Sequence, residues 1–236
     1  MQTRPRLAVQ SLFTALVTAT LLVAGCSSSD KASDAPLPEA ATLLTESNET
    51  TKAQQSVHLQ LTTTGEIPEL PIASLTGNLT QTPAVAASGK ADIVFLGQKL
   101  EGVDFVVADN ILYGAITPDS WQDFGPAADI YDVSAILNPD TGLANLLANF
   151  SDAKTDGREN VNGVDAVKVS GNVSADAVNK IAPQLAATGP VPGTAWIQEE
   201  GDHQLIQAKL EPKPGQSVQM TLSDWGKPVT VTKPAV

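Results

Sequence analysis

A two-residue alternation of apolar and polar side chains, repeated along most of the chain, is the feature that most constrains its fold. In the clearest stretch, apolar Val57, Leu59 and Leu61 are separated by polar His58 and Gln60. Further stretches, some less regular, occupy residues 75–80, 90–95, 102–107, 111–116, 154–160, 167–169, 195–197, 206–210 and 218–222. This period predicts about ten strands, most with one buried and one solvated face.

Helical patterns lie between blocks of strands. They are residues 38–55, residues 133–137 after a capping Asp132, the stripe Leu143, Leu146, Leu147 and Phe150, and a helix capped by Ser174. Such segregation predicts an α+β fold, a single antiparallel sheet with α-helices packed on one face. A sheet of this size must curl or close, and a sheet curled around helices can enclose an apolar cavity.

The N-terminus has the order of a bacterial lipoprotein signal. Arg4 and Arg6 precede an apolar segment, residues 7–24, which ends in the box Val23-Ala24-Gly25-Cys26. Small residues before a cysteine are typical of the site at which the thiol is acylated and the chain is cleaved. We expect residues 1–25 to be a signal peptide and Cys26 to carry the lipid. An uncleaved membrane anchor is the alternative.

The signal sets the expected domain organisation and location. Residues 26–37 are rich in Ser, Asp, Ala and Pro and predict a flexible tether, followed by one domain over residues 38–236. Removing the two signal arginines takes the formal net charge from −12 to −14. We expect the domain to be lipid-anchored at the periplasmic face of the inner membrane, with the cell wall as a second location.

Composition excludes several classes of function. The chain has 14 Lys and Arg against 26 Asp and Glu, which argues against a nucleic-acid partner. One Cys and two His cannot supply a disulfide framework or the usual Cys/His zinc clusters. We therefore expect no metal site and no cofactor.

Catalytic motifs are weak. Neither His58 nor His203 has a nucleophile or carboxylate at a spacing that implies a dyad. Residues 151–154 match S-x-x-K, but the companion K-T-G is absent. Residues 138–142 offer oxygen ligands without the spacing of a calcium loop. The sequence predicts a protein that is not an enzyme.

Four segments carry a resemblance to a known family. They are DFVVADNILY at 104–113, WQDFGPAADIYD at 121–132, LNPDTGLAN at 137–145 and GDHQL at 201–205. The chain resembles the LppX/LprA/LprF/LprG family of mycobacterial lipoproteins from the lipobox to the C-terminus. The resemblance implies a half-barrel sheet with helices over its concave side, enclosing an apolar cavity for acylated lipids.

The resemblance also implies a cargo and a partner. The expected cargo comprises triacylated glycolipids, namely phosphatidylinositol mannosides, lipomannan and lipoarabinomannan, together with triacylglycerides. A major-facilitator exporter is the expected partner, and transfer would run from the inner membrane to the outer envelope without any bond being made or broken.

Strand parity then suggests which residues would line the cavity. The expected wall residues are Ala91, Ile93, Phe95, Val103, Phe105, Val107, Ala195 and Ile197, with Leu143, Leu146 and Leu147 on a covering helix. Two alternatives stay open. The protein could be a non-enzymatic envelope adaptor for an exporter, with a dry core and no lipid cargo, or a glycolipid hydrolase whose base the sequence does not display.

Overall fold

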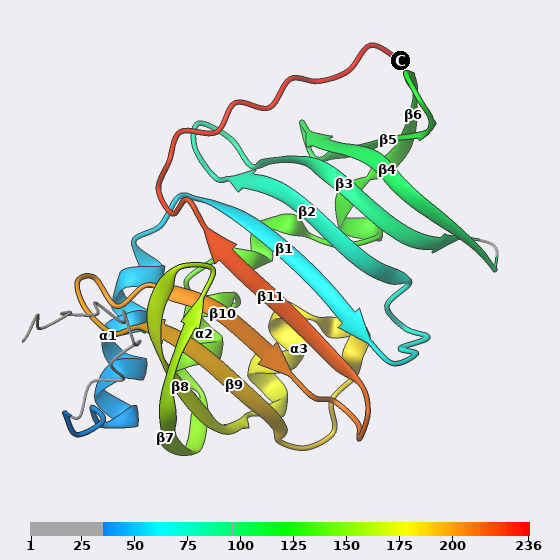
Figure 1. Ribbon diagram of the computed structural model, residues 1–236. Coiled ribbons are helices and arrows are strands. Elements are labelled where there is room, and N and C mark those ends of the chain that lie inside the picture. Colours follow the sequence, from blue (N-terminus) through cyan, green and yellow to red (C-terminus); the bar gives the residue numbers. More distant parts are fainter. Residues whose placement is uncertain (1–34, 96) are drawn as a thin grey trace, which may run out of the picture. The chain divides into compact units, whose positions relative to one another are not determined.

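The computed structural model describes residues 35–95 and 97–236, and Figure 1 shows how their helices and strands are arranged. The predicted signal peptide, Cys26 and residues 27–34 of the predicted tether lie outside the described residues. Residues 35–236 form one compact unit. In the part that is described, no helix has the length and hydropathy needed to cross a membrane.

Within the described residues, one antiparallel sheet contains every strand of the fold. Its strands are β1 (Ser56–Thr64), β2 (Ile72–Thr80), β3 (Ala86–Phe95), β4 (Gln98–Ala108), β5 (Ile111–Thr117), β6 (Ser120–Pro126), β7 (Phe150–Val161), β8 (Val164–Val173), β9 (Val191–Gln198), β10 (Leu205–Leu210) and β11 (Ser217–Ser223). The spatial order is β6-β5-β4-β3-β2-β1-β11-β10-β9-β8-β7. Because the edge strands β6 and β7 do not pair, the sheet stays open as a half-barrel.

The chain builds this sheet in two meanders. Strands β1 to β6 pair in sequence order, and the chain then crosses through helical segments to β7 at the opposite edge. Strands β7 to β11 pair back toward the centre, where Leu59 of β1 lies opposite Gly77 of β2 on one side and Leu222 of β11 on the other. The predicted α+β fold with one antiparallel sheet is confirmed.

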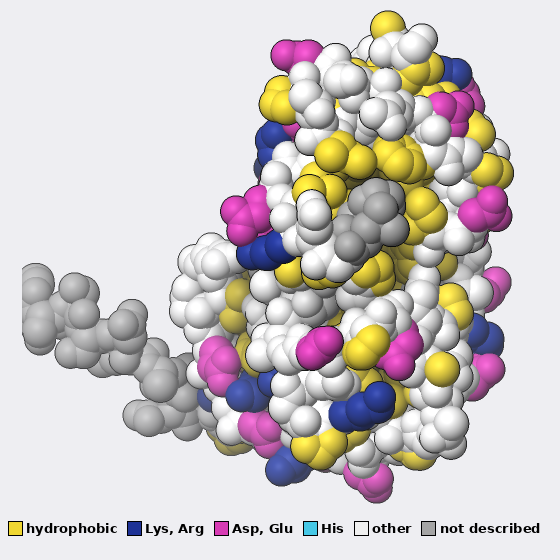
Figure 2. Space-filling model, turned by 90° about the vertical axis from the view of Figure 1, so that its right-hand side faces the viewer, with side chains coloured by type: hydrophobic (Ala, Val, Ile, Leu, Met, Phe, Trp, Pro, Cys, Tyr) yellow, Lys and Arg dark blue, Asp and Glu magenta, His cyan; other side chains and the backbone are white. Residues whose placement is uncertain are grey.

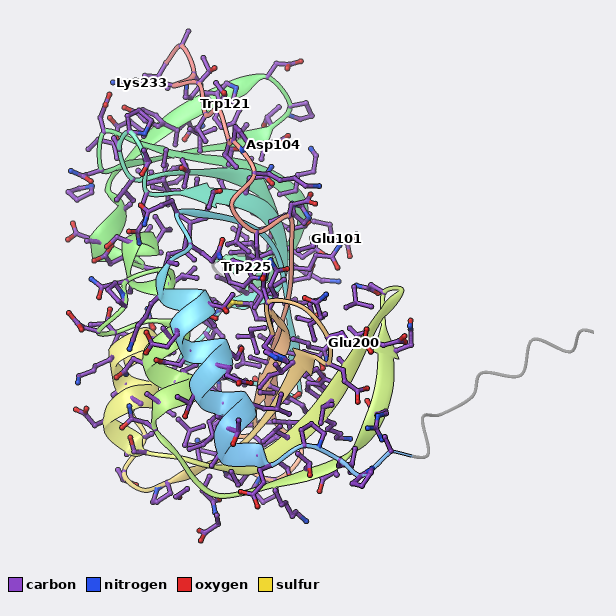
Figure 3. The ribbon with its side chains drawn as sticks, turned by 90° about the vertical axis from the view of Figure 1, so that its left-hand side faces the viewer. Glu101, Asp104, Trp121, Glu200, Trp225 and Lys233 are labelled. Atoms are coloured by element: carbon purple, nitrogen blue, oxygen red, sulfur yellow. The ribbon has the colours of Figure 1, made fainter. Side chains whose placement is uncertain are left out.

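The helical segments lie on one face of the sheet, which we call the concave face (Figures 1 and 3). They are α1 (Ala40–Lys52), η1 (Ala127–Asp129), η2 (Val133–Ile136), α2 (Leu143–Ala148), α3 (Ala175–Ile181) and η3 (Pro183–Leu185), where η marks a 3-10 helix. Both predicted caps form, since the Asp132 carboxylate accepts from the Ser134 N–H at 3.0 Å and the Ser174 hydroxyl oxygen accepts from the Ala177 N–H at 3.3 Å.

Two local expectations differ from the structure. Phe150 was expected on the helical stripe but begins β7, opposite Val173, because α2 ends at Ala148 and strand pairing takes over. Strand β6 was not expected, since its sequence Ser-Trp-Gln-Asp-Phe-Gly-Pro has little regular alternation.

Glycines permit the sharp curl of the sheet. Gly77 of β2 and Gly89 of β3 face each other, and a Cβ on Gly89 would collide with the Thr76 carbonyl oxygen. Only glycine allows two strands to approach this closely. The ring of Phe105 covers the bare backbone, with its Cζ 3.3 Å from where a Cβ on Gly77 would lie. The curl makes the helical side of the sheet concave at this point.

Candidate functional site

Strand register places one continuous row of apolar side chains across the concave face. The row runs through Val169, Ala195, Ala208, Met220, Leu61, Leu75, Ala91 and Val103, each opposite its neighbour on the next strand. Val169 and Ala195 are fully buried, and Ala91 and Val103 are almost so. The four side chains between them are only half-buried. The concave face is therefore closed at both ends of this row and open in the middle.

Two further side chains extend the half-buried area toward β5. Phe105 of β4 and Leu112 of β5 are partly buried and pack against the core cluster. We define the open region as Leu61, Leu75, Phe105, Leu112, Ala208 and Met220, which come from six strands and are all apolar. A concave apolar surface of this kind suits an apolar ligand, because it removes hydrocarbon from water without needing polar partners.

A second aromatic ring lies near the open region. Phe124 of β6 rests over Gly114 of β5, with its Cε2 2.9 Å from where a Cβ on Gly114 would lie. Gly114 is opposite Phe105, so both rings lie against glycine backbone in one row of the sheet. Phe124 is 38% exposed. A phenyl ring held over glycine has no side chain beneath it, and rotation of the Phe124 ring would uncover the Gly114 backbone.

The other half of the concave face is densely packed. We define the packed region as Val167, Val169, Val173, Ala195 and Ile197 of β8 and β9, which are 0–1% exposed beneath α2 and α3. A pocket beside it is lined by Leu143, Leu146 and Leu147 of α2, by Ala195 and, at the border with the open region, by Ala208, among others. Its volume of about 10 Å³ is that of one water-sized sphere. No acyl chain fits there without movement of the helices.

The structure separates the residues expected to line a cavity into three places. Phe105 lies in the open region, with Ala91 and Val103 at its margin and Ile93 half-buried nearer the β3–β4 turn. Val107 is buried deeper in the core. The packed half of the concave face contains five of the expected wall residues, Ala195, Ile197, Leu143, Leu146 and Leu147. The Phe95 side chain lies outside what the structure describes.

Sequence reasoning missed most of the open region. Leu61, Leu75, Leu112, Ala208 and Met220 were not among the expected wall residues, although Leu61 and Leu75 stand at inward positions of clear alternating patterns. Parity identifies the face on which such a residue lies. It does not tell which part of that face the helices leave uncovered.

A polar contact ties two of the covering segments together. The Tyr131 hydroxyl, between η1 and η2, donates to the Ile181 carbonyl oxygen at the end of α3 at 2.8 Å. Burial raises the pKa of Tyr131 well above its usual value, with a smaller contribution from the charge of Asp132. The phenol is therefore a hydrogen-bond donor at any physiological pH, and it joins the 3-10 segments to α3 over the concave face.

The interface between α1 and α2 has fewer of its buried polar atoms in hydrogen bonds. Asn48 of α1 donates to the Ala144 carbonyl oxygen of α2 at 2.5 Å. Ser47 Oγ and Thr51 Oγ1 of α1 and Asn145 Nδ2 of α2 are buried without a hydrogen-bond partner among the described residues. Buried polar atoms without partners reduce stability. The α1–α2 contact accordingly contains buried polar atoms that contribute no hydrogen bond to the helical layer.

The residues considered for catalysis lie apart from the open region. His58 Nδ1 lies 2.9 Å from Asn78 Oδ1, and His203 Nδ1 lies 3.1 Å from the Gln198 carbonyl oxygen. Ser151 donates to the Asn172 carbonyl oxygen at 3.3 Å, while Lys154 pairs with Asp156 at 3.4 Å. Among the described residues, no three His, Cys, Asp or Glu side chains are grouped so that they could hold a metal ion.

Fold and site together define a class of protein. It is an open antiparallel half-barrel whose apolar concave face is partly covered by short helices. The chain belongs to the LppX_LprAFG lipoprotein family, whose family model matches residues 39–231. The resemblance seen in the sequence is thereby confirmed.

Relatives and solved structures agree with this membership. The chain is 67% identical to the lipoarabinomannan carrier protein LprG of Mycolicibacterium smegmatis over 100% of both chains. It is 56% identical to the protein of the same name in Mycobacterium leprae over 94% of this chain and 93% of that one. The crystal structure of LprF from Mycobacterium bovis matches with a TM-score of 0.77 and 31% identity, covering 85% of this chain and 99% of that chain. LppX from Mycobacterium tuberculosis matches with a TM-score of 0.64 and 27% identity, covering 82% and 98%.

Proposed function

We propose that this protein is a non-enzymatic carrier of acylated glycolipids of the lipoarabinomannan type. The observation that supports it best is the open region, a half-buried apolar area on the concave face of a chain 67% identical to a lipoarabinomannan carrier protein. The acyl chains would lie along Leu61, Leu75, Phe105 and Met220, while the hydrophilic head stays in water. No step makes or breaks a covalent bond.

Hydrocarbon burial supplies the binding free energy in this proposal. Each methylene removed from water contributes about 0.8 kcal/mol, so a few acyl chains are held firmly without polar recognition. An apolar wall discriminates poorly between acyl chains of similar length. Such a wall is compatible with every cargo that the family resemblance implies, namely phosphatidylinositol mannosides, lipomannan, lipoarabinomannan and triacylglycerides.

Loading requires the helical layer to move. The pocket beside the packed region has room for one water-sized sphere. At the open region, the rings of Phe105 and Phe124 cover glycine backbone. In our proposal the weakly satisfied α1–α2 contact separates, the two rings rotate, and the acyl chains replace them against the wall. The packed region keeps its structure while this happens.

The anchor and the direction of transport complete the proposal. Cys26 would carry the lipid that tethers the domain to the periplasmic face of the inner membrane, with residues 26–37 as the tether and residues 38–236 as the carrier domain. Cargo would move from the inner membrane toward the outer envelope, with a major-facilitator exporter as partner. The acidic surface that follows from a net charge of −14 without the two signal arginines keeps the loaded carrier domain soluble.

The experiment that tests the carrier function is mass spectrometry of an organic extract from purified protein. The protein is made as the mature chain, residues 26–236, with Cys26→Ala, so that neither its own acylation nor the apolar signal segment adds lipid to the extract. We expect acylated glycolipids in the extract, and uptake of offered lipoarabinomannan by the emptied protein. A folded protein that yields no acylated lipid and takes up none would contradict the proposal and favour the adaptor, whose surface alone would act.

A further inference from the structure

The C-terminal segment crosses the outer face of the sheet, opposite the helices. After β11 the chain passes the ends of β1 and β2 and continues to the C-terminus beside β6 (Figure 1). We call residues 226–236 the C-terminal strap. One end is fixed where Gly226 N–H donates to the Ser56 carbonyl oxygen at 3.0 Å and the Ser56 hydroxyl donates to the Lys227 carbonyl oxygen at 2.7 Å.

The other end of the C-terminal strap is held by Lys233, which is labelled in Figure 3. Its Nζ lies 5.4 Å from the centre of the Tyr113 ring and 3.5 Å from a carboxylate oxygen of Asp109. Between these two fixed points, the backbone of residues 228–232 makes no backbone–backbone hydrogen bond within the described residues. Between its two fixed ends the strap therefore does not pair with the sheet as a further strand.

A pocket of about 240 Å³ lies under the C-terminal strap. Its lining consists of His58, Asn78, Asp224, Lys227, Pro228, Val229 and Thr230. His58 alternates along β1 with the buried Val57 and Leu59, which places the pocket on the outer face, away from the open region. One ordered water needs only about 10–15 Å³ measured in this way. The pocket has room for a small organic group.

The charges in this pocket cancel. Lys227 Nζ donates to Asp224 Oδ1 at 2.6 Å, and this contact lowers the pKa of the Asp224 carboxyl. An anion would meet the Asp224 carboxylate, and a metal cation would meet the Lys227 ammonium. The pocket thus disfavours ions of either sign and suits a neutral ligand.

The same groups offer both hydrogen-bond donors and acceptors. His58 Nδ1 lies 2.9 Å from Asn78 Oδ1 and its Nε2 lies 3.5 Å from Thr76 Oγ1, so both ring nitrogens already have partners. The groups left for a ligand are the Asn78 amide N–H, the Thr230 hydroxyl and the second carboxylate oxygen of Asp224. Amides, hydroxyls and carboxylates together can satisfy the hydroxyl groups of a ligand, which donate and accept at once. A ring that carries several hydroxyls matches this lining better than an apolar group does.

We propose that the pocket under the C-terminal strap binds one neutral sugar ring of a saccharide. This goes beyond the carrier function, because the pocket lies on the opposite face of the sheet from the acyl-chain wall. The saccharide is either the glycan of a carried lipid that passes around the sheet or a separate envelope polysaccharide. A site of this kind would hold the glycan against the carrier and orient the complex.

The test measures binding of a saccharide without acyl chains. Deacylated lipoarabinomannan and methyl α-D-mannopyranoside are titrated into the mature chain, residues 26–236 with Cys26→Ala, and followed by NMR chemical shifts. We expect millimolar affinity for the monosaccharide, as is usual for a ligand with few heavy atoms. Shifts should be confined to the strap and to the strands beneath it. Absence of saturable binding by both probes overturns the proposal.

Variants locate the site. Val229→Trp fills the pocket and Asn78→Ala removes an amide, and each should weaken saccharide binding by about tenfold or more. Gln60→Ala, on the same face of β1 but outside the pocket, should bind as the unsubstituted chain does. A melting temperature for each variant identifies any that misfold, and a folded Val229→Trp that binds normally also overturns the proposal.

Intact lipoarabinomannan distinguishes the two sources of saccharide. If the glycan belongs to the carried lipid, Val229→Trp weakens binding of the intact molecule as well as of its deacylated form. If the glycan is a separate polysaccharide, only binding of the deacylated form falls. Because neither saccharide probe carries acyl chains, failure of this proposal leaves the carrier function standing.

Discussion

The two parts of the concave face carry the same kind of residue in different surroundings. In the packed region, β8 and β9 present side chains that are 0–1% exposed beneath α2 and α3. In the open region, β1, β2, β4, β5, β10 and β11 present equally apolar side chains that remain half-buried. A single sheet thus serves two purposes. One part stabilises the fold, and the other leaves apolar wall for a ligand, because the helices cover it incompletely.

The largest expected effect breaks the packed region. Ile197→Ala removes three side-chain carbons from a fully buried site and should lower the free energy of unfolding by about 2–5 kcal/mol. Chemical denaturation measures this loss. Leu75→Ala, in the open region, is the matched comparison and should cost clearly less, while lowering lipid affinity more. Equal losses of stability at both sites would show that the two regions do not differ.

The second prediction fills the open region. Ala208→Trp places an indole where acyl chains would lie, and excluding two methylenes costs about 1.6 kcal/mol, or more than tenfold in lipid affinity. Uptake of a fluorescent lipid measures the change. Thr62→Trp, on the exposed outer face of β1, is the control and should bind lipid normally. Normal uptake by Ala208→Trp would place the cargo elsewhere.

A smaller effect is expected for the hydrogen bond of Tyr131, which joins the 3-10 segments to α3. Tyr131→Phe removes the hydrogen bond to the Ile181 carbonyl oxygen and should cost about 1 kcal/mol. Because this tie holds the cover over the concave face, the variant should also exchange bound lipid faster. Stopped-flow transfer between protein and vesicles measures the rate. An unchanged exchange rate would mean that the tie does not restrain the cover.

The smallest effect is expected at residues 35–39, the segment that leads into α1. The Arg158 Nε lies 2.7 Å from Glu199 Oε1, and the same guanidinium donates to the Ala35 and Pro36 carbonyl oxygens. Arg158→Ala should cost about 1 kcal/mol or less. Hydrogen exchange at the Leu43 amide, which donates to the Glu39 carbonyl oxygen at the start of α1, should become faster while the packed region keeps its protection. Unchanged exchange at Leu43 would show that Arg158 does not fix the start of α1.

The sequence predicted the sheet well because period-two alternation reflects one buried face, and that face is buried throughout most of this fold. It predicted the caps at Asp132 and Ser174 because these depend on local hydrogen bonds. It missed β6, an edge strand whose side chains are mostly exposed and therefore need not alternate.

The site was harder to predict than the sheet. Ala91 and Ala195 occupy similar places in similar patterns, yet Ala195 lies under α2 and Ala91 lies at the margin of the open region. The difference comes from where the helices sit, which is a tertiary property. The pocket under the C-terminal strap depends in the same way on Asp224 meeting His58 across two strands, and no spacing in the sequence reports it.

Photolabelling with a glycolipid that carries a diazirine on an acyl chain tests the central claim most directly. After loading and irradiation, mass spectrometry locates the labelled residues. We predict labels in the open region, at Leu61, Leu75, Phe105 and Met220, and none at Val167 or Val169 of the packed region. Labels confined to the packed region, or to the outer face of the sheet, would contradict the account.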